Sequence, residues 1–261
     1  MNITLKEKTA LVGGSSGGIG KAIAQQLAES GASVTIMSRS ANKMTQIIAE
    51  LPTDQGQKHQ YLVVDFSDFE NYKRIISTYF ENNKIDILVN NTQGPSAGNA
   101  LEKQTEDYQQ AFDLLFKTVV FTTELALNQM QKNQWGRIIN VASVSVKEPL
   151  SYLALSNTIR AAVVTWAKSL ATDVGHYQIT VNSILTGYFD TERIEQLNAK
   201  KAEQLGIPAS EVRADMESKV PVKRIGDPKE YGYLVTFLAS DQAAYITGTQ
   251  IPIDGGLLKS L

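Results

Sequence analysis

Short apolar runs alternate with longer amphipathic stretches along most of the chain. The runs contain four or five residues, and the stretches between them place apolar residues at helical spacing. Near-continuous apolar strands that alternate with helices are typical of a parallel sheet covered on both faces. We therefore expect one doubly wound α/β domain over residues 1–261, with about seven strands. The expected strands are Thr9–Val12, Val34–Met37, Tyr61–Val64, Ile85–Val89, Arg137–Val141, Thr180–Ile184 and Gln250–Ile253.

The amphipathic stretches predict the helices. Apolar residues repeat every three or four positions in Ile19–Glu29 and in Ile159–Asp173, as on one face of a helix. A charged helical segment around residues 188–228 interrupts the alternation between the last two expected strands. Because it falls near the carboxyl edge of the expected sheet, it is predicted to form either a lid over a site or a helical pair on the surface.

Composition and charge narrow the possible functions. A net charge of −2, with Lys and Arg scattered along the chain, argues against a nucleic-acid partner. No apolar run reaches the ~20 residues that span a bilayer, and the N-terminal residues lack the plan of a signal peptide. We therefore expect no membrane association and a cytoplasmic location. With no Cys and only His59 and His176, no metal site is expected.

The strongest motif follows the first expected strand. Residues 14–20 read GSSGGIG and open the first expected helix. Glycine allows a tight turn and lets a pyrophosphate approach the backbone, where free amides and the helix dipole meet its charge. A glycine-rich turn between a strand and a helix near the N-terminus predicts nucleotide binding.

The spacing G-x-x-x-G-x-G resembles that of the short-chain dehydrogenase/reductase family, whose members have a Rossmann fold. The resemblance extends over nearly the whole chain. Further segments that resemble family motifs are Asp65, residues 90–94 (NNTQG), residues 140–143 (NVAS), residues 181–191 (VNSILTGYFDT), residues 245–248 (YITG) and residues 253–256 (IDGG).

The resemblance implies a dinucleotide site. Its expected residues are Gly14, Ser15, Ser16, Gly18, Ile19, Gly20, Ser38, Arg39, Asp65, Phe66, Asn91, Arg160, Gly187, Phe189 and Thr191. Members that prefer NAD carry an acidic residue at the end of the second strand, where this chain has Ser38 and Arg39. An Arg can pair with the 2′-phosphate of NADP, so NADP is expected in preference to NAD. Otherwise, Arg39 is a solvated cation that begins the next helix.

The resemblance also implies a catalytic Ser, which is Ser143. The positions of the family's catalytic Tyr and Lys, thirteen and seventeen residues further on, hold Ser156 and Arg160. The family's Asn that holds a water relay corresponds to Leu115, although a helix can slip by a turn in such a comparison. Arg160 can bind ribose hydroxyls but cannot relay protons near neutral pH. Ser156 can donate a hydrogen bond but is a weaker acid than a phenol.

Two tyrosines are candidates to replace the missing phenol. Tyr152 would lie one turn before Ser156 on a continuous helix, and Tyr188 follows the loop of residues 186–191. Either can instead be a packing residue.

Two function hypotheses follow. In the first, the chain is an NADP(H)-dependent oxidoreductase similar to the 3-oxoacyl reductases, which reduces a carbonyl group or an activated double bond of a small molecule. In the second, it is a catalytically silent nucleotide-binding sensor or scaffold, and Ser143 simply ties a loop. Family members pair through the helix that bears the Tyr–Lys motif, so a homotetramer or homodimer is expected.

Overall fold

In the computed structural model, which describes residues 2–260, seven strands form one parallel sheet in the order β3-β2-β1-β4-β5-β6-β7. The predicted doubly wound α/β fold is therefore confirmed. Two strands have the predicted bounds, and the others differ by one or two residues at an end. The strands are β1 (Thr9–Val12), β2 (Ser33–Ser38), β3 (Gln60–Val63), β4 (Ile87–Asn90), β5 (Gly136–Val141), β6 (Ile179–Thr186) and β7 (Gln250–Ile253).

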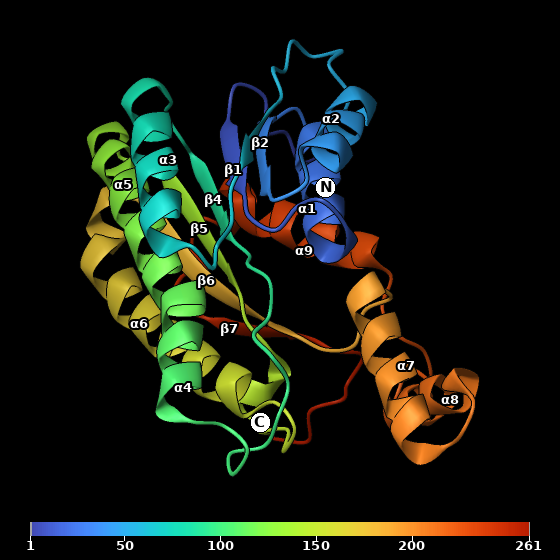
Figure 1. Ribbon diagram of the computed structural model, residues 1–261. Coiled ribbons are helices and arrows are strands. Elements are labelled where there is room, and N and C mark those ends of the chain that lie inside the picture. Colours follow the sequence, from blue (N-terminus) through green and yellow to red (C-terminus); the bar gives the residue numbers. More distant parts are fainter. Residues whose placement is uncertain (1, 261) are drawn as a thin grey trace.

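Helices cover both faces of the sheet (Figure 1). One face packs against α1 (Gly18–Glu29), α2 (Ala41–Glu50) and α9 (Pro228–Ala239). The other packs against α3 (Phe69–Asn82), α4 (Thr105–Phe112), α5 (Thr118–Asn133) and α6 (Ala154–Val174).

The sheet has one hydrophobic core on each face, because side chains along a strand alternate between the two faces. In β1, Val12 joins the core with α1, whereas Leu11 joins the core with α6. In β4, Val89 and Leu88 divide in the same way. Because successive side chains point to opposite faces, strands buried on both sides need apolar residues at nearly every position. This requirement explains the near-continuous apolar runs in the sequence.

The carboxyl ends of the parallel strands meet at one edge of the sheet. The strand order reverses direction between β1 and β4, and such a switch point is where α/β proteins bind ligands. The charged segment between β6 and β7 contains α7 (Glu192–Leu205) and α8 (Ala209–Lys219). Figure 1 shows these two helices as a pair that projects away from the sheet. Among residues 2–260, no helix has the length and apolarity to cross a membrane.

Ser15 fixes the loop that leaves β1. Its side chain is fully buried, its Oγ donates to the carbonyl oxygen of Val12 (2.9 Å), and it accepts from the amide of Met37 in β2 (3.0 Å). The amide of Ser15 donates to the Met37 carbonyl oxygen (3.1 Å). Ser15 therefore holds the glycine loop against the sheet by these hydrogen bonds.

Replacing Ser15 with Ala should lower the free energy of unfolding by about 1–3 kcal/mol, because the buried amide of Met37 loses its side-chain acceptor. Urea denaturation measures this change. The neighbouring Ser16→Ala is the matched control, since the Ser16 side chain lines a cavity and forms no hydrogen bond within residues 2–260. Equal stability of the two variants would contradict this structural role.

Candidate active site

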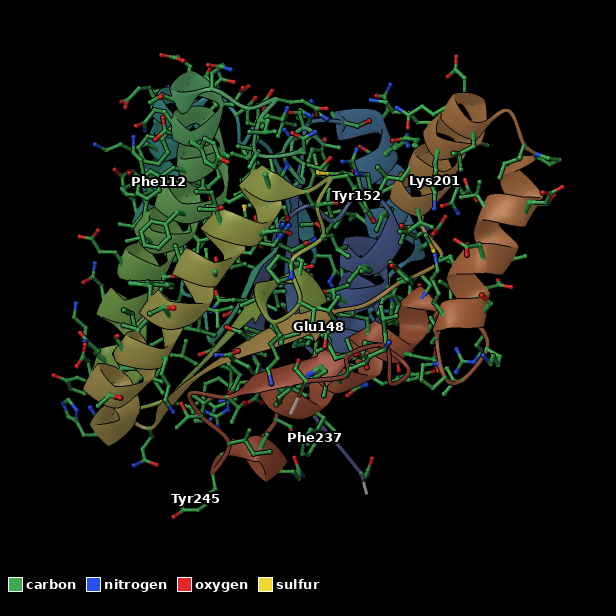
Figure 2. All side chains as sticks on the ribbon, turned by 90° about the horizontal axis from the view of Figure 1, so that it is seen from below. Phe112, Glu148, Tyr152, Lys201, Phe237 and Tyr245 are labelled. Carbon is green, nitrogen blue, oxygen red and sulfur yellow. The ribbon has the colours of Figure 1, made fainter. Side chains whose placement is uncertain are left out.

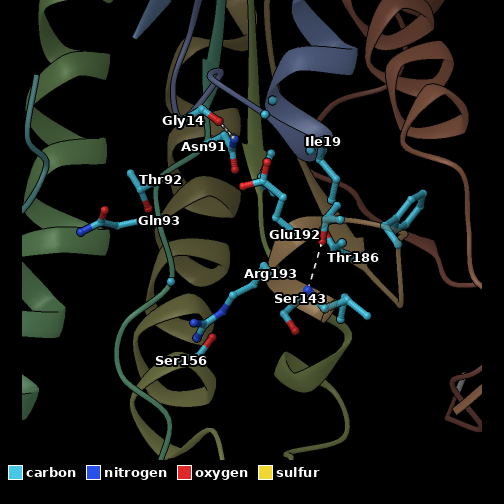
Figure 3. A pocket seen from close by; sticks show the side chains of 18 of the residues that line it. Gly14, Ile19, Asn91, Thr92, Gln93, Ser143, Ser156, Thr186, Glu192 and Arg193 are labelled. Atoms are coloured by element: carbon cyan, nitrogen blue, oxygen red, sulfur yellow. Dashed lines mark hydrogen bonds between the residues drawn. The ribbon is translucent and has the colours of Figure 1, made fainter. Parts of the chain in front are cut away.

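A cavity of about 700 Å³ opens at the carboxyl edge of the sheet. The loops after β1, β4, β5 and β6 line it, together with the first turns of α6 and α7. Figure 3 shows the loop residue Gly14 at one end of this cavity and Ser156 at the other. The glycine loop and the predicted catalytic serines therefore share one cavity.

The glycine loop has room for a phosphate group. A Cβ added at Gly17 would meet no atom within 4 Å, and Gly17 lines the cavity directly before α1. Gly18 has a φ of +51°, in the left-handed region that favours glycine. The side chain of Asn91 donates to the carbonyl oxygen of Gly13 (3.0 Å) and fixes the loop from β4. The loop thus leaves the N-terminal amides of α1 open to an anion.

A second cavity of about 620 Å³ adjoins the first and shares Gly14, Arg39 and Lys43 with it. Arg39 follows β2 and is exposed, and Lys43 lies one turn later in α2. The lining of this cavity contains one carboxylate, Glu192, which lies 3.6 Å from the Lys43 ammonium. Asp65 lies outside the lining, but it is close enough to Arg39 for the guanidinium to contribute to lowering its pKa. Two cations at this position fit the 2′-phosphate of NADP.

Most of the predicted cofactor residues meet in these two cavities. Ser15 and Asp65 do not line them. Ser15 holds the loop as described above, and the Asp65 carboxylate accepts from the side chain (2.6 Å) and the amide (2.9 Å) of Ser67. These hydrogen bonds lower the pKa of Asp65. The predicted residues that line at least one cavity are Gly14, Ser16, Gly18, Ile19, Gly20, Ser38, Arg39, Phe66, Asn91, Arg160, Gly187, Phe189 and Thr191.

Ser143, Ser156 and Arg160 all line the first cavity. Arg160 is on α6, one turn after Ser156, and its Nε–H donates to Ser156 Oγ (3.3 Å). Its Nη1–H donates to the carbonyl oxygen of Val141 at the end of β5. Burial lowers the pKa of Arg160. The guanidinium therefore ties α6 to β5 and lies directly behind the hydroxyl of Ser156.

Ser143 lies two residues after Val141, the last residue of β5, and caps a short 3₁₀-helix. Its Oγ accepts from the amide of Ser145 (3.1 Å). Within the described residues neither Ser143 nor Ser156 donates its hydroxyl hydrogen to the protein. Because each hydroxyl oxygen already accepts one hydrogen bond, each O–H is left to donate into the cavity. The two serines can thus hold an acceptor oxygen there.

The two tyrosines lie outside this arrangement. Helix α6 begins at Ala154, so Tyr152 precedes it and does not lie one helical turn before Ser156 on that helix. A turn and a backbone hydrogen bond from Gly98 to the carbonyl oxygen of Tyr152 (2.8 Å) hold this residue away from the helix. Figure 2 shows Tyr152 near the end of α6 that faces the two projecting helices.

The pKa of each tyrosine also argues against proton transfer. Partial burial raises the pKa of Tyr152 and that of Tyr188 above the usual value. Neither residue lines either of the two cavities. A phenol that transfers protons near neutral pH needs a lowered pKa and access to the substrate.

Leu115 lies in a π-helix (Asp113–Lys117) that joins α4 to α5. Its side chain is 2% exposed and packs in the core between the sheet and α6. π-helical turns are frequent at functional sites, but Leu115 carries no polar group and does not line the first cavity. This position therefore supplies no side chain for a water relay.

Several lining residues were not predicted. Lys43 lies one turn after Arg39, so helical spacing from Arg39 could have indicated it. Glu192 and Arg193 begin α7, directly after the predicted Thr191. Thr92 and Gln93 belong to the segment that resembles a family motif, but their side chains differ from that motif and gave no functional signal.

A doubly wound sheet with a glycine loop at its switch point defines a dinucleotide-binding protein of the Rossmann type. The family model described as enoyl-(acyl carrier protein) reductase matches residues 14–258. The chain belongs to the short-chain dehydrogenase/reductase family, and it is an oxidoreductase by this membership.

Several of the similar proteins are named as reductases. The chain is 29% identical over 259 residues to "NADPH-dependent reductase BacG" of Bacillus subtilis (strain 168), which covers 98% of this chain and 100% of that protein. It is 35% identical to the 3-oxoacyl-[acyl-carrier-protein] reductase FabG of Haemophilus influenzae, and the match covers 98% of this chain and 100% of that protein. The structure of L-sorbose reductase from Gluconobacter frateurii, complexed with NADPH and L-sorbose, has a TM-score of 0.93 and 28% identity over the full length of both chains. The comparisons support the prediction of NADP.

Replacing Arg39 with Ala should weaken NADPH binding about ten- to hundredfold, because charge-assisted hydrogen bonds to the 2′-phosphate are lost. NADH binding should stay unchanged. Calorimetric titration with both nucleotides measures the effect. Arg74→Ala is the control, since Arg74 is an exposed Arg of α3 outside both cavities. A parallel loss of NADH affinity in the Arg39 variant would contradict selective phosphate binding.

Proposed function

We propose that this protein is an NADPH-dependent reductase of a carbonyl group on a small molecule. The observation that carries the proposal is the pair of serine hydroxyls, Ser143 and Ser156, in the cavity that also holds the glycine loop. Each accepts a hydrogen bond from a fixed N–H group and keeps its own hydrogen to donate. Two donors that converge on one cavity suit a carbonyl oxygen that gains negative charge.

Ser156 and Arg160 take the positions of the family's Tyr and Lys in this proposal. Arg160 donates to Ser156 Oγ, and a hydroxyl oxygen that accepts from a cation becomes a stronger donor. The Ser–Arg pair therefore stabilises negative charge on the substrate oxygen, although neither residue has a pKa suited to proton storage near neutral pH.

The proposed reaction balances with one proton. Bound NADPH would supply a hydride to the carbonyl carbon, with the glycine loop, Asn91 and the Arg39–Lys43 pair holding the nucleotide. The carbonyl oxygen accepts from Ser143 and Ser156 as its π bond breaks. It then takes a proton from the Ser156 hydroxyl, which bulk solvent reprotonates through water in the cavity, so that NADPH, the carbonyl compound and one solvent proton give NADP⁺ and an alcohol. The segment around residues 188–228 acts as the lid, because residues 191–194, 196 and 197 line the cavity.

NADPH oxidation tests the proposal directly. The purified protein is assayed with ketones, sugars, 2-oxo acids, 4-oxo acids, 3-oxoacyl thioesters and enoyl thioesters. Reduction of at least one carbonyl compound is expected. Reduction of the enoyl thioesters alone would assign the activated double bond instead. NADPH binding without oxidation by any compound would favour the silent nucleotide sensor.

Replacing Ser156 with Ala should lower kcat about 10²–10³-fold, the usual cost of removing one donor to a developing oxyanion. Ser143→Ala should have a similar effect, and NADPH affinity should remain that of the wild type in both. The control is Ser151→Ala, because Ser151 is exposed and does not line either cavity. Steady-state kinetics and calorimetry together measure these effects. Unchanged kcat in both variants would remove the serines from the mechanism.

Replacing Tyr152 or Tyr188 with Phe should change kcat less than about twofold. A residue outside the cavity is expected to contribute only a fraction of a kcal/mol to stabilisation of the transition state. Burial raises the pKa of both phenols, so neither phenol should add a limb to the pH profile near neutral pH. The pH dependence of kcat in both variants should match that of the wild type. A large loss of kcat in one variant would identify that tyrosine as the proton donor.

A further inference from the structure

The side chain of Arg193 places a positive charge at the end of the cavity where the substrate would bind. The proposed reaction does not use this charge. It is the second residue of α7 and lines the cavity together with Ser143 and Ser156. In Figure 3 its side chain extends from α7 toward Ser156 and away from Gly14 and Ile19. The guanidinium is thus directed toward the reacting end and not toward the glycine loop.

Within residues 2–260, Arg193 forms no ion pair, whereas the other arginines of the 188–228 segment do. Arg213 bonds to Asp190 with two contacts of 2.9 Å, and Arg224 bonds to Glu230. The adjacent Glu192 does not neutralise Arg193, because its carboxylate pairs with Lys43 at 3.6 Å. Figure 3 shows Glu192 extending the opposite way, toward Asn91. Arg193 therefore offers an uncompensated charge.

The position of Arg193 is also unfavourable for the stability of α7. A cation in the first turn of a helix opposes the helix dipole, which favours anions there. The amides of the first turn add to the positive potential at this end of the cavity. Helix capping takes part of this potential, because Thr191 Oγ1 accepts from the amide of Ile194 (3.4 Å). Glu192 and Glu195 also lie in the first turn and offset this field, so the attraction for an anion comes mainly from the guanidinium of Arg193.

The proposed cofactor does not account for this charge. The phosphate groups would lie at the glycine loop and beside Arg39 and Lys43, at the other end of the combined cavities. Arg160 is held by its hydrogen bonds to Ser156 and to the Val141 carbonyl oxygen, and the proposed reaction already uses it to support Ser156. An anionic group of the substrate is the partner that Arg193 lacks.

We propose that Arg193 binds the carboxylate of an oxo-acid substrate, while Ser143 and Ser156 bind the carbonyl oxygen that is reduced. The proposal rests on the carbonyl reduction proposed above and assigns its substrate class. The planar fork of an Arg matches the two oxygens of a carboxylate and gives two parallel hydrogen bonds. Placed on α7, Arg193 also couples binding of the carboxylate to the position of the lid.

The test compares each oxo acid with its methyl ester. A 2-oxo acid and a 4-oxo acid are used with their esters, in the wild type, in Arg193→Gln and in Lys200→Gln. Lys200 is an exposed cation of the same helix that does not line the cavity. We expect the wild type to prefer at least one acid over its ester. In Arg193→Gln, kcat/KM for that acid should fall about ten- to hundredfold, mainly through KM, and the value for its ester should not change.

Two binding measurements separate this proposal from the reaction itself. Calorimetry of the protein saturated with NADP, titrated with the same oxo acids, should show binding in the wild type and in Lys200→Gln and loss of binding in Arg193→Gln. This measurement requires no turnover, so it decides the role of Arg193 even if no carbonyl compound is reduced. Calorimetry with NADPH alone should give equal affinities for all three proteins.

Three outcomes would overturn the proposal. Loss of NADPH affinity in Arg193→Gln would assign Arg193 to the cofactor. Equal losses for acid and ester would make Arg193 a structural residue of the lid. Preference of the wild type for neutral compounds, with no binding of either oxo acid, would exclude a carboxylate substrate. A silent protein that nevertheless binds an oxo acid through Arg193 would refute the reaction but keep the assigned ligand class.

Discussion

Parallel strand direction is the constraint on which the site depends, because each crossover returns the chain through a helix and brings every strand to the same edge. The loops after β1, β4, β5 and β6 meet there, although they are separated by up to about 170 positions in the sequence. Burial on both faces enforces this arrangement, since a strand with apolar residues at every position has no stable place at a solvated surface. The same apolar content that drives folding therefore gathers the polar groups of the cavity.

Arg160 makes the local connection that the catalytic end needs. By donating to the end of β5 and to Ser156, it joins the loop that carries Ser143 to the helix that carries Ser156. A Lys could form only point contacts from a flexible stem, whereas the guanidinium holds both acceptors in one plane. Rigid placement of the two hydroxyls matters more in this site than in one with a phenol, because the stabilisation of charge must come from oriented donors.

The sequence was sufficient for the fold and for most of the residues that line the two cavities, since both depend on periodic apolar runs and on glycines whose backbone role is independent of distant contacts. It was not sufficient for side chains whose role depends on direction. Tyr152 has the correct spacing from Ser156 for one helix, yet α6 begins two residues after it. Nothing in the sequence distinguishes Lys43 and Arg193 from other surface cations, and both are exposed. Only the tertiary arrangement places them at the cavities.

In the proposed mechanism Ser156 and Arg160 stand where the family has a Tyr–Lys pair, and this difference changes what the substrate must supply. A phenol of tuned pKa can accept the whole task of proton transfer, whereas a serine supported by a guanidinium mainly stabilises charge and relies on water for the proton. Binding energy from a second, remote group then becomes more valuable, because it can hold the carbonyl carbon in line for hydride transfer. An anion held by a cation on α7 would provide this energy and would close the lid segment over the reacting groups at the same time.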